Sequence, residues 1–199
     1  MVEEIKELAT SQEFTGEYLV EEILWKTARE IGWPGEPVSA PIAGKYYARA
    51  IIMHRGLNVI VSINLWGIRT IFDLIHNVSD TMAGAKPISF PIEIQSEATN
   101  IKSYSFSLSN GDKLVALWTD GVAVEDDPGI TTTLILPGFS DQRVTGIDVL
   151  HGFQQQMITD MEDGDLVIRD LLVKDYPIIL RLAPTRYVFL PIALKGHAQ

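Results

Sequence analysis

The sequence predicts an α+β protein in which two βα units are followed by an antiparallel β-sandwich of about eight strands. Two observations lead to this prediction. Before residue 86, β-branched apolar runs alternate with segments in which apolar residues recur every three or four positions, as strands and helices require in turn. After Lys86-Pro87, apolar residues recur at every second position in short runs separated by turn signals. We therefore expect two domains, residues 1–85 and residues 86–199.

The first part is expected in the order strand, helix, strand, helix. The segment EYLVEEI, residues 17–23, predicts a strand. The run VIVSINLW, residues 59–66, is rich in β-branched residues, which favours a strand covered on both faces. Between them a helix is expected to begin after Ser39, a favourable N-cap residue, and to close at RGLN. A final helical stripe runs from Ile68 to Met82 and stops at Gly84.

The second part consists of short segments that each predict one strand. Asn-Gly-Asp, Asp-Pro-Gly, Pro-Gly and Asp-Gly-Asp turn signals lie between several of them. Regular spacing and alternation indicate an antiparallel sandwich, with Trp118 expected in its core. The segments are IEIQS, KSYSFSL, KLVALWT, TTTLILP, VTGIDVL, DLVIRDLLV, YPIILRL and YVFLPI.

Two βα units do not make a complete sheet. Parallel strands are normally covered on both faces within a larger sheet, and two strands alone leave their edges unpaired. The mean hydropathy of +0.12 also indicates a surface buried against something else. We therefore expect a homo-oligomer or a barrel portion that precedes this segment.

Composition restricts the class of partner. The net charge of −10 disfavours nucleic acid and anionic lipid, because both would be repelled, and it remains compatible with a neutral sugar. The apolar run Ala48–Met53 is too short to span a bilayer, which needs ~20 residues. The sequence has no cysteine, no histidines at metal-ligand spacing and no nucleotide-binding fingerprint, so no metal or cofactor is expected. Localisation is left open.

Several segments together resemble a known family. GEYLVEEILWKT resembles the seventh barrel strand of the retaining (β/α)8 glycoside hydrolases of clan A, where a T-E-x-G-W-like run carries the nucleophilic glutamate. AGKYYARAIIMHRGLNVIVSINLWG is similar to the following helix and the eighth strand. The alternating segments from MAGAKPI onward are similar to the β-sandwich that follows the barrel in many such enzymes. The resemblance covers residues 14–182 and implies a partial (β/α)8 barrel.

Residue by residue, the resemblance implies a site built around Glu22. Glu22 takes the nucleophile position, and Trp25 and Trp66 match aromatic residues that contact the sugar. Leu24 departs from the family pattern, which has glycine at that position. The family's acid/base glutamate lies in an Asn-Glu motif on the fourth strand, and this sequence contains no Asn-Glu dipeptide. The acid would therefore come from another polypeptide or another copy, and whether the chain is itself an enzyme stays open.

Other interpretations of the same residues are possible. Side chains of consecutive strand residues point to opposite faces, so Glu21 and Glu22 are not expected to form the catalytic pair of a retaining enzyme, and both could be solvated strand-end carboxylates. The chain could instead be a non-catalytic carbohydrate-binding or oligomerisation module. Carbohydrate binding would require exposed aromatic residues on one sheet face. The candidates for such a face are Tyr104, Phe106, Phe139, Phe153 and Tyr176.

Overall fold

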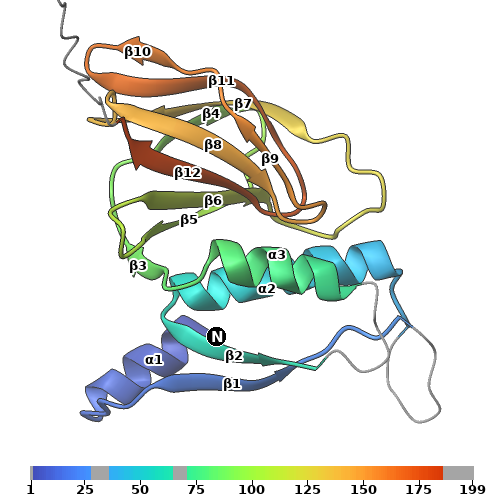
Figure 1. Ribbon diagram of the computed structural model, residues 1–199. Helices are drawn as coiled ribbons and strands as arrows, with labels where there is room; N and C mark the ends of the chain where they lie inside the picture. Colours follow the sequence, from blue (N-terminus) through green and yellow to red (C-terminus); the bar gives the residue numbers. More distant parts are fainter. Residues whose placement is uncertain (1, 28–35, 65–70, 186–199) are drawn as a thin grey trace, which may run out of the picture.

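The computed structural model describes residues 2–27, 36–64 and 71–185, and it has three layers (Figure 1). A two-stranded parallel sheet forms one outer layer, with α1 (Val2–Ser11) beside it. Helices α2 (Ala40–Gly56) and α3 (Phe72–Thr81) form the middle layer. The third layer is a pair of antiparallel sheets. The protein is therefore α+β, as the change of periodicity predicted.

Strands β1 (Tyr18–Ile23) and β2 (Val59–Ile63) run parallel, with α2 between them in sequence. Ser39 is the N-cap of α2, as predicted, and its hydroxyl accepts a hydrogen bond from the N–H of Ile42 at 3.5 Å. The chain leaves α2 through Asn58, whose φ of 54° lies in the left-handed region that asparagine tolerates at helix ends. The strand and helix order predicted for residues 17–82 is thus confirmed wherever the structure describes it.

Ten described strands follow the helices and form a six-stranded sheet packed face to face on a four-stranded sheet. The orders are β3-β5-β6-β12-β8-β9 and β10-β11-β7-β4, and every pairing is antiparallel. The strands are β3 (Lys86–Ile88), β4 (Glu93–Ser96), β5 (Ile101–Ser107), β6 (Lys113–Thr119), β7 (Ile130–Leu136), β8 (Gln142–Asp148), β9 (Phe153–Gln156), β10 (Asp160–Glu162), β11 (Asp165–Val173) and β12 (Ile178–Pro184).

The number of strands departs from the prediction of about eight. Strands β3, β9 and β10 were not predicted, because segments of three or four residues are too short to establish an alternating period. The predicted strand YVFLPI lies outside the described residues. The Asp163-Gly164 turn between β10 and β11 is confirmed, since both residues have positive φ, as a tight hairpin turn requires.

Two apolar cores lie on opposite faces of the six-stranded sheet. One fills the space between the two sheets and includes Val115, Leu117, Leu166 and Leu180. The other packs α2 and α3 against the outer face of the six-stranded sheet. Trp118 belongs to this second core, so its prediction as a residue of the inter-sheet core is corrected: alternation along β6 points it toward the helices.

The same packing corrects two further expectations. Phe106 is buried in the helix-facing core and Tyr104 packs against it, so neither belongs to an exposed aromatic face for sugar binding. Strand β2 was expected to be covered on both faces. Its residues Val59, Val61 and Ile63 are buried or half-buried, whereas Ile60 and Ser62 are exposed. Only one face of the strand pair is therefore covered within the described residues.

Candidate active site

Glu22 lies at the carboxyl end of β1, beside the end of β2. The strand pairing is regular from Tyr18 to Val20 and shifts between Val20 and Ile23, so Glu21 and Glu22 occupy a bulge. A bulge adds a residue to one strand and redirects side chains, and bulges are frequent beside active sites. The expectation that Glu21 and Glu22 point to opposite faces assumed a regular strand, and both side chains are in fact exposed.

The Glu22 carboxylate has a partner on the neighbouring strand. The side-chain amide of Asn64, the residue after β2, donates a hydrogen bond to Glu22 Oε1. The backbone N–H of Asn64 donates to the carbonyl oxygen of Ile23 at 3.1 Å, which extends the parallel pairing past the bulge. Two polar side chains from adjacent parallel strands thus meet at the carboxyl edge of the sheet. Sequence reasoning did not identify Asn64, although it lies within the strand predicted over residues 59–66.

Trp25 packs toward α2. Its ring stacks on Tyr46, with centroids 5.5 Å apart and planes at 21°, and it meets Tyr47 edge to face at 5.0 Å. Trp25 is half-buried against the helix-facing core. These are the contacts of a packing residue, so a role for Trp25 in sugar binding would have to coexist with that packing. Trp66, the other predicted aromatic residue of the site, lies outside the described residues.

Tyr47 on α2 connects the two strand ends. Its hydroxyl accepts a hydrogen bond from the N–H of Trp25 at 3.0 Å and donates one to the carbonyl oxygen of Asn64 at 2.9 Å. Burial raises the pKa of Tyr47; the hydrogen bond from Trp25 opposes this shift and the negative charge of Glu22 adds to it. The hydroxyl therefore stays protonated at neutral pH and can donate to Asn64. Sequence reasoning missed this polar role of Tyr47.

A buried polar cluster attaches the opposite side of α2 to the sandwich. Lys45 Nζ lies 2.7 Å from Asp175 Oδ1, in an ion pair without hydrogen-bond geometry, and both side chains are buried. Arg49 donates hydrogen bonds to the carbonyl oxygens of Asp175 at 2.6 Å and Gly121 at 2.5 Å. Burial lowers the pKa of Arg49, and the negative charge of Asp175 opposes the shift. The helix that holds Tyr47 is therefore fixed in place from both sides.

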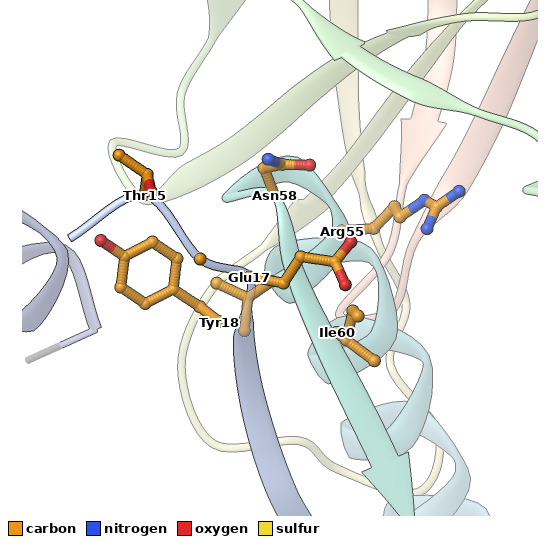
Figure 2. Close-up of a pocket in the computed structure, with 8 residues that line it drawn as sticks. Thr15, Glu17, Tyr18, Arg55, Asn58 and Ile60 are labelled. Atoms are coloured by element: carbon orange, nitrogen blue, oxygen red, sulfur yellow. The ribbon is translucent and has the colours of Figure 1, made fainter.

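A pocket of about 360 Å³ lies at the other end of the strand pair, where β1 and β2 begin (Figure 2). Its walls include Thr15, Tyr18, Asn58 and Ile60, and the side chain of Glu17 extends toward Arg55. In barrels of alternating strands and helices, chemistry occurs at the carboxyl ends of the strands and the opposite face serves stability. This pocket therefore lies at the opposite end of the strands from Glu22.

The chain matches no protein-family model, and no curated protein is similar to it in sequence. Within residues 2–27, 36–64 and 71–185, no three His, Cys, Asp or Glu side chains are grouped in a way that could hold a metal ion. In the same residues, no helix combines the length and apolar character needed to cross a bilayer. The site must therefore be interpreted from its geometry alone.

Proposed function

We propose that this chain carries the nucleophile portion of a retaining glycoside hydrolase-like site, with Glu22 as the nucleophile. The observation that supports this most is the meeting of Glu22 and Asn64 at the carboxyl ends of two adjacent parallel strands. The edge formed by the carboxyl ends of parallel strands is where such folds place their chemistry. The bulge beneath Glu22 and the exposure of its side chain are also consistent with an acid that meets a ligand.

The proposed reaction uses the two oxygens of Glu22 differently. Asn64 engages Oε1 and orients the carboxylate, so Oε2 is assigned to attack the anomeric carbon of a sugar. The bond from that carbon to the leaving oxygen breaks, and a general acid protonates this oxygen. Water then hydrolyses the glycosyl-enzyme ester. A retaining site needs its second carboxyl group roughly 5–5.5 Å from the first.

We propose that the second carboxyl group comes from strands that pair with β1 and β2, supplied by another copy or another polypeptide segment. Among the described strands, each of these two pairs only with the other. On the face away from α2, Leu19 is 61% exposed and Ile60 is 47% exposed. In a closed barrel the corresponding side chains fill the interior. An exposed apolar face with two open edges suits further parallel strands.

Covalent labelling tests the role of Glu22. A 2,4-dinitrophenyl 2-deoxy-2-fluoroglycoside has a leaving group that needs little protonation and forms an ester that is hydrolysed slowly, so a nucleophile can be trapped without its acid partner. We expect the glucoside, xyloside or mannoside to add one sugar mass to the peptide that contains Glu22. E22Q should abolish the label, and E21Q, the matched neighbouring change, should retain it. A label absent with all three sugars, or retained in E22Q, contradicts the assignment.

A second candidate function, an oligomerisation module without catalysis, is favoured by one observation. Among the described residues up to position 60, five large apolar side chains are exposed on α1, β1, β2 and the loop before β1: Ile5, Leu8, Phe14, Leu19 and Ile60. Apolar surface of this kind marks an interaction site in soluble proteins. Association without any labelling of Glu22 would favour this function, whereas labelling of the assembled protein would favour the first.

A further inference from the structure

A second pocket of about 360 Å³ lies at the edge of the sandwich. One wall is the end of the six-stranded sheet, with Phe153 and Gln155 on β9. The opposite wall is β11 of the other sheet, with Asp170 and Leu172, and Tyr176 also lines the pocket. This pocket shares no residue with the site around Glu22.

The backbone of β11 is distorted where it forms the pocket wall. Its pairing with β7 shifts between Ile168 and Leu171, and Asp170 in that interval has a φ of 54°. A non-glycine residue in the left-handed region is strained, and such strain clusters at binding sites. The bulge also places Asp170 in the pocket lining. A regular strand would have avoided both the strain and the interruption of the sheet.

The pocket presents a flat apolar surface next to free polar groups. Phe153 is 71% exposed, and its ring lies nearly parallel to that of His151, with centroids 5.9 Å apart. Within the described residues, the amide of Gln155 has only the sulfur of Met157 as a partner, at 3.9 Å, and the carboxylate of Asp170 has none. An aromatic face with an amide and a carboxylate beside it can bind the apolar C–H groups and the hydroxyl groups of one ligand.

The charges in the pocket select against an anionic ligand. Lys174, the cation among the lining residues, already donates to the carbonyl oxygen of Asp127 at 2.6 Å. The carboxylate of Asp148 is occupied by the hydroxyl of Tyr176 and by His151, both at 3.0 Å. The polar groups still available to a ligand are the neutral amide of Gln155 and the negative carboxylate of Asp170, in a chain with a net charge of −10. A neutral polyhydroxyl ligand fits these groups better than an anion does.

We propose that this pocket binds a neutral oligosaccharide, with Phe153 as the stacking surface and Gln155 and Asp170 as hydroxyl partners. The proposal goes beyond the function assigned to Glu22 and does not rest on it. It gives the sandwich a role in holding a sugar chain, whether or not the parallel strands take part in cleaving one.

Calorimetric titration of the full chain with xylohexaose, cellohexaose and mannohexaose tests the proposal, together with amide NMR shifts. We expect millimolar or tighter binding of at least one of the three, with shifts at Gly146 and Gln155. F153A should weaken this binding about five- to tenfold, through loss of the stacking surface. I158A truncates another exposed apolar residue, on the loop after β9 and outside the pocket lining, and should leave the affinity unchanged.

The proposed function is tested by covalent labelling at Glu22, whereas this proposal is tested by the amide shifts at the pocket and by F153A, so failure of the one and failure of the other give different results. Binding of none of the three sugars would overturn the proposal, and so would equal affinities for wild type, F153A and Q155A. The edge strand β9 could instead pair with a second copy of the chain. Sedimentation that shows a dimer lost in F153A, without any effect of sugar, would establish that outcome and overturn sugar binding.

Discussion

The hydroxyl of Tyr47 lies 3.0 Å from the backbone nitrogen of Trp25, although one residue is on α2 and the other follows β1. The same hydroxyl bonds the carbonyl oxygen of Asn64, after β2. Because Tyr47 is fully buried, water cannot easily replace either bond. The spacing of Glu22 and Asn64 therefore depends on a helical residue outside the site itself.

Replacing Tyr47 by phenylalanine should lower the free energy of unfolding by about 2 kcal/mol, because it removes the partner of a half-buried N–H and of a half-buried carbonyl. Urea denaturation followed by tryptophan fluorescence measures the change. Tyr18→Phe is the matched control, since its hydroxyl makes one long bond of 3.4 Å to Lys6, and it should cost less than about 0.5 kcal/mol. Equal losses in the two variants would contradict the role given to Tyr47.

Replacing Lys45 by methionine should lower the free energy of unfolding more than Tyr47→Phe does, because it leaves the carboxylate of Asp175 buried without its cation. Removing one partner of a buried pair costs about 3–5 kcal/mol. The double variant Lys45→Met/Asp175→Asn should lose less than the sum of the two single losses, because no uncompensated charge remains. Strictly additive losses in the denaturation midpoints would show that the pair is not coupled.

Two glycines of α2 should respond in opposite directions to alanine. At Gly44 a new Cβ would meet Leu74 and Leu150 at 3.4 and 3.5 Å, which is ordinary contact, so helix propensity should stabilise the protein by up to about 1 kcal/mol. At Gly56 the Cβ would collide with the ring of Tyr104, so the same change should destabilise the protein. Thermal unfolding of the two variants provides the comparison, and a stabilised G56A would refute the packing described for Tyr104.

Stability should fall at alkaline pH. Burial raises the pKa of Tyr176, and the adjacent charge and hydrogen bond of Asp148 add to the shift. The unfolded chain therefore loses this proton at a lower pH than the folded protein. The stabilisation is complete below the ordinary tyrosine pKa of about 10 and declines above it, by up to about 1.4 kcal/mol per pH unit. Tyr176→Phe should show a shallower alkaline decline in urea titrations, and an identical slope would contradict this.

The open face of the strand pair should control self-association. Leu19→Lys places a charge on an exposed apolar position, so it should prevent assembly while changing the stability of the monomer little. Light scattering across a concentration series measures the effect. Val122→Lys, at a more exposed position on the sandwich side, is the matched control and should leave assembly intact. A wild-type chain that stays monomeric at every concentration would remove the need for a partner on this face.

Sequence patterns predicted the elements whose apolar spacing is strong. The N-cap at Ser39, the parallel strand segments and most sandwich strands follow from local periodicity and turn chemistry. Strand β9 was missed because its sequence, FQQQ, has no apolar alternation. The orientation of Trp118 was predicted wrongly, because alternation along a strand does not say which of two cores each face meets.

Within the candidate site, Glu22 was proposed through a resemblance, whereas Asn64, Tyr47 and the Lys45–Asp175 pair were not predicted. Lys45 and Asp175 are 130 positions apart in the sequence, and no local sequence pattern predicts such a contact. A lysine at position 45, within a stretch of small and aromatic residues, was the one available hint, since a buried cation requires a partner.

The packing of α2 and α3 on the six-stranded sheet has a practical consequence for anyone who divides this protein. Residues Phe106, Leu114, Ala116 and Ile179 are shielded from water by helices that precede them in the chain. A recombinant fragment starting at residue 86 would expose this apolar surface, so it should precipitate or bind chaperones. Residue 86, where the apolar period of the sequence changes, is therefore an unsuitable start for a recombinant fragment.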